Sequence, residues 1–365
     1  MFVQTKKPLF SSCNLFKLLE NKAVYRQRAS KIKSIKNAFV TFDGLVFKNL
    51  ILEKSSAFNL RGIKDKNFYF VFWKEAFEKY LVSKFGKSIP VIQLSDKYTY
   101  LLIHSKWFNY SFWINAYLPR LIQFVEQHQL TDVKLIYPEN WDQIPYVSQS
   151  LTLFSIEKEV VPLDHQLFIP NLTFVELRDY TASFYPASIL NTTNFIKGKL
   201  KFNSNFPFRN VYLTRRKRGV RSVENESEVI SLLRKYDFQI VTFEDLSFLE
   251  QVKLMHETKL FISIHGAGFS NLMFMQPQSY VVELINEQYA NMEYTFPFWK
   301  LASASDVNYS GLLCEVNNRS TSLLGYGKKK NVNENDYLVN ANIEVPLDEL
   351  EEIILTILND SSEIS

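Results

Sequence analysis

The sequence contains few of the residues that mark small disulfide-bonded or repetitive proteins. Cysteine occurs twice in 365 residues, at Cys13 and Cys314, which is too few for a disulfide framework or a cysteine-rich zinc site. The 10 glycines and 12 prolines fall below average usage, which excludes collagen-like and low-complexity chains and disfavours a turn-dense all-β fold. We therefore expect an α/β or mixed fold in a reducing compartment, by default the cytoplasm.

Long apolar segments are also missing. No run approaches the roughly 18 to 20 apolar residues that a membrane span needs, and the N-terminus has no apolar signal core ahead of a cleavage site. The sequence thus predicts a protein that is not exported. Its 46% hydrophobic and 15% aromatic residues are enough for packed cores, and its length suits two domains.

Positive charge is concentrated near the N-terminus. Residues 1–36 hold nine Lys and Arg against the single acid Glu20, a net charge of about +8, so the rest carries about −4. Because apolar side chains precede most of these charges, the segment could lie on an anionic membrane surface or follow a phosphate backbone. It could equally be a solvated basic helix, or a helix packed on the N-terminal domain through Leu15, Leu18 and Leu19. No RNA-binding motif supports a nucleic-acid partner.

The first half of the sequence alternates between strand and helix patterns. Such alternation implies parallel strands joined by right-handed crossovers, so this half is expected to be Rossmann-like. The expected elements are a hairpin around Asp43-Gly44, a helix near 73–85, a strand at 98–103, a helix at 112–128, and a strand at 133–137 followed by a loop and a further helix.

The second half repeats the alternation more clearly and predicts a second doubly wound sheet. The expected elements are strands at 210–214, 238–242, 260–264 and 280–285, helices at 224–236, 247–258 and 347–358, a helical turn at 270–274, and a surface loop at 325–336. The expected boundaries are an N-terminal domain at 1–205, a second domain at 206–345, and a closing helix and tail at 346–365.

The most informative stretch follows the strand expected at 260–264. His265 is followed by Gly266, Ala267 and Gly268, and a helical turn begins soon afterwards. In an open α/β sheet the ligand lies at the carboxyl ends of the strands, where small residues let backbone N–H groups approach a phosphate. The pattern predicts a diphosphate cradle with the imidazole pointing toward the ligand, although an ordinary strand-to-helix turn would use the same residues.

Two further residues are candidates for the same edge of the sheet. Arg215 directly follows the strand at 210–214, in a basic run ending at Arg218, and its planar guanidinium suits phosphate oxygens. Glu283 lies within an apolar strand, where a buried carboxylate needs donors such as ribose hydroxyls or a structural salt bridge.

In order and spacing, the motifs of the second half resemble glycosyltransferase family 61. The matching segments are Tyr212 to Arg216, Asn225-Glu226, Phe243 to Gln251, His265 to Asn271, Glu283, Phe298 to Ala302, Tyr309, and Val345 to Leu350. The resemblance implies a GT-B fold, with two Rossmann-like doubly wound domains facing a cleft. It also implies inverting transfer of a sugar from a nucleotide donor, usually without a metal.

The resemblance also implies roles for individual residues. Arg215 and the loop at 265–268, including the catalytic candidate His265, would stabilise the leaving diphosphate. Glu283 would hold the ribose. Asn225, Glu226 and Asn271 would help to bind the donor, although an Asn at a helix start is also an ordinary cap.

The first half matches the family less closely. Its helix motif, Asn109 to Arg120, has Phe112 and Ala116 where members usually carry a His and an acid. An inverting transfer needs a base to deprotonate the acceptor hydroxyl. His104, which follows the strand at 98–103, is the substitute that we expect. The competing candidates after the next strand are Glu139 and Asp142.

Together these features predict a glycosyltransferase that adds one sugar to a surface polysaccharide or a lipid-linked glycan. The donor would be a nucleotide sugar, UDP-linked, bound by residues 206–345, with residues 1–205 on the acceptor side and no metal or other cofactor. The expected location is cytoplasmic, with peripheral attachment to the inner membrane through residues 1–36. The alternative, suggested by Phe112 and Ala116, is a noncatalytic glycan- or nucleotide-sugar-binding protein of the same fold.

Overall fold

A computed structural model of the chain contains two compact units. Unit 1 comprises Met1–Gln27 together with Leu200–Ser365, and unit 2 comprises Arg28–Lys199. The structure describes residues 2–11, 15, 19–20, 23–27, 29–49, 51–56, 78, 90–105, 108–176, 184–202, 206–215, 221–288, 296–316 and 341–362. The predicted helix at 73–85, apart from Glu78, the basic residues 216–218 and the predicted loop at 325–336 lie outside this set.

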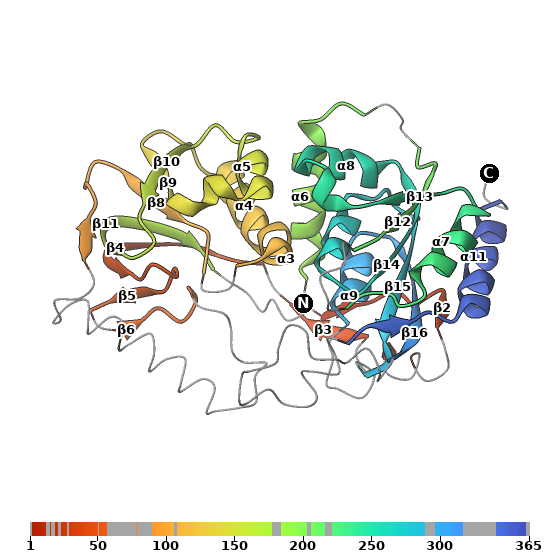
Figure 1. Cartoon of the computed structure of the whole chain (residues 1–365). Coiled ribbons are helices and arrows are strands. Elements are labelled where there is room, and N and C mark those ends of the chain that lie inside the picture. The colour runs from red at the N-terminus through yellow and green to blue at the C-terminus, as the bar shows by residue number, and fades with distance from the viewer. Residues whose placement is uncertain are drawn as a thin grey trace. The chain divides into compact units, whose positions relative to one another are not determined.

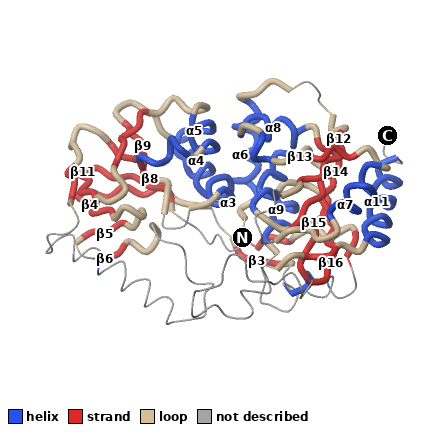
Figure 2. The backbone as a smooth tube through the Cα atoms, in the orientation of Figure 1, coloured by secondary structure: helices blue, strands red, loops and turns tan. Residues whose placement is uncertain are grey.

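Unit 1 is built on a mostly parallel sheet (Figures 1 and 2). In sheet order its strands are β13 (Phe238–Val241), β12 (Arg209–Leu213), β14 (Thr258–Ile264), β15 (Tyr280–Asn286), β16 (Asn308–Val316) and β17 (Ile343–Glu344). All neighbours are parallel except β16 and β17. Counted along the chain from β12, the parallel strands have the order 2-1-3-4-5, which is that of flavodoxin-like sheets.

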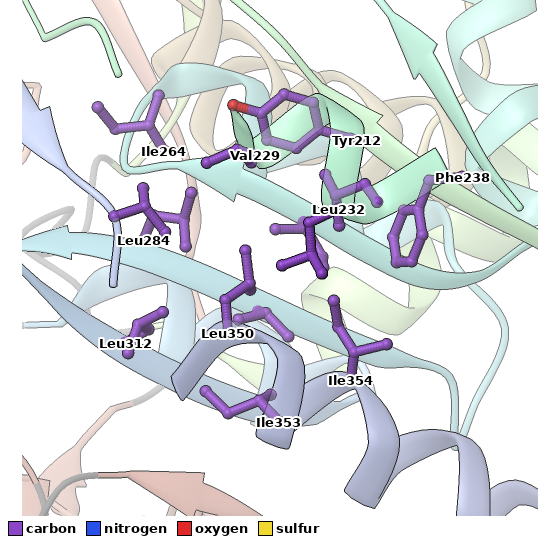
Figure 3. Packing of buried hydrophobic residues seen from close by; sticks show 14 of the residues in the cluster. Tyr212, Val229, Leu232, Phe238, Ile264, Leu284, Leu312, Leu350, Ile353 and Ile354 are labelled. Carbon is purple, nitrogen blue, oxygen red and sulfur yellow. The ribbon is translucent and has the colours of Figure 1, made fainter. Parts of the chain in front are cut away.

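Helices cover both faces of this sheet (Figure 1). On one face lie α7 (Glu226–Arg234) and α11 (Leu347–Ser362), and on the other lie α8 (Phe248–His256), α9 (Pro297–Ala304) and the 3-10 helix η5 (Ala267–Phe274). Side chains of successive strand residues point to opposite faces of the sheet. Because helices cover both faces, both sets of side chains are buried, and the strands are apolar on both sides. Figure 3 shows Leu350 and Ile354 of α11 in the same buried cluster as Leu284 and Leu312 of the strands. The second doubly wound arrangement predicted from the sequence is therefore present.

The N-terminal segment belongs to unit 1, although the sequence placed it in the N-terminal domain. Its strands are β1 (Phe2–Gln4), β2 (Phe10–Ser11) and β3 (Val24–Arg26). β2 pairs in parallel with β16, and the backbone N–H of Leu9 donates to the carbonyl of Tyr309 over 2.8 Å. Leu15 and Leu19 are fully buried. Residues 1–27 thus group with Leu200–Ser365 in unit 1.

The basic region at 1–36 is consequently not one helix. Residues 32–36 form the start of β4 (Ile32–Val40) in unit 2, where the Lys33 ammonium lies 3.1 Å from the Glu53 carboxylate and 3.5 Å from that of Glu176. The apolar stripe that could have entered a membrane is used inside the protein at Leu15 and Leu19. Within the described residues, no helix combines the length and apolar character required to cross a bilayer.

Unit 2 combines parallel and antiparallel strands in one sheet. In order, the strands are β10 (Glu157–Val161), β9 (Val133–Pro138), β8 (Thr99–Leu102), β11 (Gln166–Val175), β4, β5 (Val46–Lys48) and β6 (Ile51–Leu52), and β7 (Val91–Gln93) also pairs with β11. The first four are parallel to one another, whereas β11 and β4 are antiparallel. The predicted hairpin is confirmed as β4 and β5, with Gly44 at φ +80° in its turn.

Helices follow the parallel strands of unit 2, as the sequence predicted. They are α3 (Tyr110–Phe112), a π-helical turn (Trp113–Tyr117), α4 (Leu118–Gln127), a 3-10 turn (Glu139–Gln143), α5 (Pro145–Leu151) and α6 (Pro186–Gly198). Both units thus show the expected α/β class with parallel strands. The more specific GT-B arrangement, in which two domains face a cleft, stays a prediction.

Candidate active site

The strand order of unit 1 defines where a ligand is expected to bind. From β12 the chain moves outward to β13 and then crosses to β14 on the other side of β12. In open α/β sheets, ligands bind beyond the carboxyl ends of the strands at this point of reversal. The segments that follow β12 and β14 are the two predicted phosphate-binding stretches, beginning at Thr214 and His265. The topology therefore brings them to the same edge.

Arg215 and Gly266 are adjacent at this edge. A Cβ atom placed on Gly266 would lie 3.6 Å from Nη1 of Arg215, so the guanidinium lies beside the Gly266 backbone. The two strand ends are held together by Ser263, whose hydroxyl donates to the carbonyl of Leu213 over 2.8 Å. Arg215 as a whole is half-buried, which strengthens the electrostatic interactions of its guanidinium. This pair supports the predicted diphosphate site.

His265, Glu283 and Tyr309 form a hydrogen-bonded chain across β14, β15 and β16. Nδ1 of His265 bonds to Oε1 of Glu283, and the Tyr309 hydroxyl donates to Oε2 of the same carboxylate over 2.6 Å. Glu283 is 1% exposed and His265 is 9% exposed. Both carboxylate oxygens already have protein partners, so the geometry favours a role in orienting His265 over the predicted contact with a ribose.

The small residues of the loop serve different purposes. A Cβ atom on Gly268 would lie only 2.5 Å from Cδ2 of Leu213, so a side chain there would force the Leu213 side chain to move. Gly266 has an extended backbone, and its nearest neighbour, Arg215, is at ordinary contact distance. Ala267 begins η5. Asn271 is fully buried, and its amide donates to Gln251 of α8 over 3.3 Å, so it ties η5 to α8.

The family model described as Glycosyltransferase 61 matches residues 110–282. Residues 110–282 are thus similar to glycosyltransferase family 61. This bears out the resemblance recognised from the C-terminal motifs. The matched range contains Arg215 and the loop at 265–268, and it ends directly before Glu283.

Curated relatives match shorter segments of the chain. The EGF domain-specific O-linked N-acetylglucosamine transferase of Bos taurus is 35% identical over 71 residues, 18% of this chain and 14% of that protein. The Drosophila melanogaster protein of the same name is 38% identical over 78 residues, 20% of this chain and 15% of its own length. The Gallus gallus protein is 30% identical over 81 residues, 21% and 15% of the two chains. The chain thus aligns with about one seventh of these relatives.

Asn225 and Glu226, which lie within the range matched by the family model, have structural partners. The Asn225 side chain donates to the carbonyl of Val345 and accepts from its N–H, over 2.9 and 3.0 Å, which holds the segment leading into α11. Glu226 accepts from the hydroxyl of Thr214 over 2.6 Å and from that of Tyr212 over 3.2 Å. Glu226 therefore fixes the end of β12 one residue before Arg215, whereas Asn225 faces away from the phosphate loop toward Val345.

His104, the predicted base, lies in unit 2 after β8 and is 7% exposed. Burial, assisted by the nearby positive charge of Arg120, lowers the pKa of His104 to about 3. The ring is therefore neutral near pH 7, as a base must be, but a group with so low a pKa accepts a proton weakly. Its ring packs edge-on against Trp141, with centroids 5.2 Å apart. These features favour a structural role.

The competing base candidates are also engaged. Asp142 accepts a hydrogen bond from the Tyr137 hydroxyl over 2.5 Å and lies 3.7 Å from the Lys158 ammonium. Glu139 accepts from the backbone N–H of Leu163 over 3.3 Å. Neither carboxylate forms a buried ion pair like that of His265 with Glu283. The identity of the catalytic base therefore stays a prediction. Within the described ranges, no group of three or more His, Cys, Asp or Glu side chains is placed to hold a metal ion.

Sequence reasoning did not assign two residues that the structure places at important positions. Tyr309 was noticed only as part of the family motif, and its contact with Glu283 depends on the pairing of β15 with β16. Arg120 is 4% exposed, and its guanidinium donates to the carbonyls of Ile103 and Val175 at the ends of β8 and β11. The available signal for Arg120 was a basic residue in an otherwise apolar helix.

Proposed function

We propose that this protein transfers one sugar from a nucleotide-sugar donor to a glycan acceptor, with inversion and without a metal ion. The observation that carries the proposal is the position of Arg215 beside Gly266, with His265 next to it, at the ligand-binding edge of a flavodoxin-like sheet. Arg and His⁺ side chains with backbone N–H groups are the donors that a diphosphate requires. The family match supports this chemistry.

In the proposed reaction, an acceptor hydroxyl oxygen attacks the anomeric carbon of the donor sugar from the face opposite the diphosphate. The bond from that carbon to the phosphate oxygen breaks, and its electron pair moves to the diphosphate. The proton of the hydroxyl passes to a base. Arg215 and His265 stabilise the charge that accumulates on the leaving phosphate, which is the electrostatic task that a divalent metal performs in other enzymes.

The identities of the donor sugar and of the acceptor are proposed from the family resemblance and from the names of the relatives. We propose a UDP-linked donor, and the relatives named N-acetylglucosamine transferases make N-acetylglucosamine the first sugar to test. For the acceptor we propose a surface polysaccharide or a lipid-linked glycan. The curated relatives' own acceptor is not carried over, because the alignment covers only 14 to 15% of their length.

A noncatalytic binder is the second candidate, favoured by Phe112 and Ala116 at the positions where family members usually carry a His and an acid. A panel of nucleotide sugars separates the two. A donor that binds only the folded protein raises its melting temperature, by roughly 2.7 kcal/mol of stability at 100 times its Kd. An enzyme also converts that donor to nucleotide, by hydrolysis or by transfer to an acceptor. Stabilisation without turnover would favour the binder, and no stabilisation by any nucleotide would contradict both.

The proposed location is the cytoplasm, with attachment to the inner membrane through residues 1–36. Since Leu15 and Leu19 are buried, attachment would have to rely mainly on the basic side chains. Such binding weakens steeply with salt, since each basic residue near an anionic surface contributes about 1 kcal/mol. Sedimentation with anionic vesicles at low and high salt tests it, and absence of salt-sensitive binding would rule it out.

A further inference from the structure

We propose that Tyr309 is a positioning residue that fixes the Glu283 carboxylate and, through it, the ring of His265. The proposal rests on the proposed function, because it gives His265 its place beside the leaving diphosphate. Glu283 and Tyr309 lie beyond the range matched by the family model, which ends at residue 282.

The contacts form a continuous line from β16 to the phosphate loop. The Tyr309 hydroxyl donates to Oε2 of Glu283 over 2.6 Å, and Oε1 of Glu283 bonds to Nδ1 of His265. Tyr309 is 3% exposed and Glu283 is 1% exposed. Because water hardly reaches this carboxylate, its orientation is set by these two partners, and loss of one would leave a buried oxygen without its donor.

A carboxylate on Nδ1 determines which nitrogen of the histidine carries the proton. The bond to Glu283 keeps a proton on Nδ1, so that Nε2 becomes the nitrogen that exchanges protons with a ligand. The Phe298 ring of α9 also packs against this histidine, 5.0 Å away between centroids, and Arg215 lies beside the adjacent Gly266. A base or acid oriented by a third group is the general arrangement of catalytic histidines.

The backbone of β16 is adapted to this arrangement. Gly311 is the residue paired with Glu283, and a Cβ atom there would lie 3.4 Å from the Tyr309 hydroxyl oxygen. That distance is tighter than most contacts, so a side chain at 311 would crowd the hydroxyl. The same Cβ atom would lie 2.7 Å from Leu15 of the N-terminal segment. The N-terminal segment thus lies against β16 at two points: the N–H of Leu9 donates to the carbonyl of Tyr309, and Leu15 lies beside Gly311.

The test uses the full-length protein labelled with ¹⁵N-histidine, in which five histidines give signals and His265→Gln assigns the one of interest. We expect the wild-type ring to carry its proton on Nδ1. In Tyr309→Phe, which keeps the ring, we expect that proton to exchange with water about tenfold faster or more, because the carboxylate is free to turn. The matched control is Tyr280→Phe, whose hydroxyl donates to Asp360 over 2.8 Å in the same unit. It should leave the His265 signal unchanged.

Kinetics supply the second readout. With an active donor, we expect kcat of Tyr309→Phe to fall about tenfold while the donor KM changes less than about threefold, because positioning matters most when charge develops on the leaving group. In a Glu283→Gln background, adding Tyr309→Phe should cause less than about a twofold further change, because Tyr309 acts through the carboxylate. Equal proton exchange in the Tyr309 and Tyr280 variants, or additive kinetic effects, would overturn the proposal. A wild-type protein without turnover would contradict the proposed function and leave the exchange result to decide this proposal.

Discussion

Both units have polar side chains near the carboxyl ends of parallel strands, but these side chains differ in burial and in their partners. In unit 1, Arg215 is half-buried beside a glycine, and His265 is partnered by a carboxylate. In unit 2, His104 and Arg120 also lie at or near the ends of parallel strands, but both are buried, and Arg120 is bonded to backbone carbonyls. The comparison shows that a strand end alone does not make a site. The polar groups must also keep an electrostatic partner and access to a ligand.

Deletion of residues 1–27 should have the largest effect, and it should be confined to unit 1. The deletion removes β2 from β16 and exposes the surface covered by Leu15 and Leu19, each worth roughly 1.5 to 3 kcal/mol of burial. Hydrogen exchange should show lost protection in β14 to β16 and unchanged protection in β8 to β11. Leu15→Ala should reproduce part of the loss. Equal loss in the two units would mean that they do not fold separately.

Arg215→Ala should lower kcat/KM for the donor by about two to three orders of magnitude, because one charge-assisted contact to the leaving group is lost. The matched control, Arg234→Ala, removes an exposed arginine from α7 and should change the rate less than about twofold. Arg120→Ala in unit 2 should instead lower the melting temperature. Normal kinetics in Arg215→Ala would remove this residue from the site.

The two glycines of the loop should respond differently to an added methyl group. Gly268→Ala should lower the free energy of unfolding by about 1 to 3 kcal/mol, because its Cβ would collide with Leu213. Gly266→Ala should change it by less than about 0.5 kcal/mol, because the nearest atom is at ordinary contact distance and the backbone is extended. Urea denaturation measures both. Equal costs would show that the loop packs differently from this structure.

His104 should make unit 2 sensitive to acid. Its pKa is lowered from 6.5 to about 3 in the folded protein, so between these values the unfolded chain binds a proton that the folded one does not. Its contribution to stability is complete above pH 6.5 and is lost as the pH falls toward 3, with a slope of at most about 1.4 kcal/mol per pH unit. Unfolding of His104→Gln between pH 7 and pH 4 should show a shallower dependence. Identical slopes in both proteins would contradict the buried, neutral histidine.

Excess EDTA should have the smallest effect, with turnover unchanged within about twofold, because Arg215 and His265 carry the leaving-group charge in the proposed mechanism. The assay is donor turnover before and after chelation. Loss of activity that Mn²⁺ restores would overturn metal independence and with it the assignment of the charge to these two side chains.

Local pattern was sufficient to predict the parts of unit 1 that depend on neighbouring residues. Strands β12 and β14 end close to where their apolar runs end, so Arg215 and His265 could be assigned to one edge of a sheet. The partners of Glu283 could not be predicted in the same way. They depend on the register of three strands that are separate in the sequence, and on the hydroxyl of Tyr309 reaching forward two positions along β16, to the level of Gly311.

The sequence was least informative where distant segments meet. The pairing of β2 with β16 involves two residues of a segment whose charge suggested a surface role, and no local pattern distinguishes the two outcomes. His104 satisfied the positional rule for a site, but burial and the charge of Arg120 lower its pKa, and Gly44 lies close against its backbone. The close packing at Gly268 comes from Leu213, which lies 55 positions earlier.

The pairing of Leu9 with Tyr309 also constrains the order of events during synthesis. The two residues leave the ribosome 300 positions apart, which at roughly 5 to 20 residues per second is about 15 to 60 s. During that interval all of unit 2 is synthesised and can fold, while β2 of the N-terminal segment has no β16 to pair with. A chaperone that holds exposed Leu15 and Leu19 would find them available for most of this time. Nascent chains stopped near residue 200 should therefore bind such a chaperone through residues 1–27.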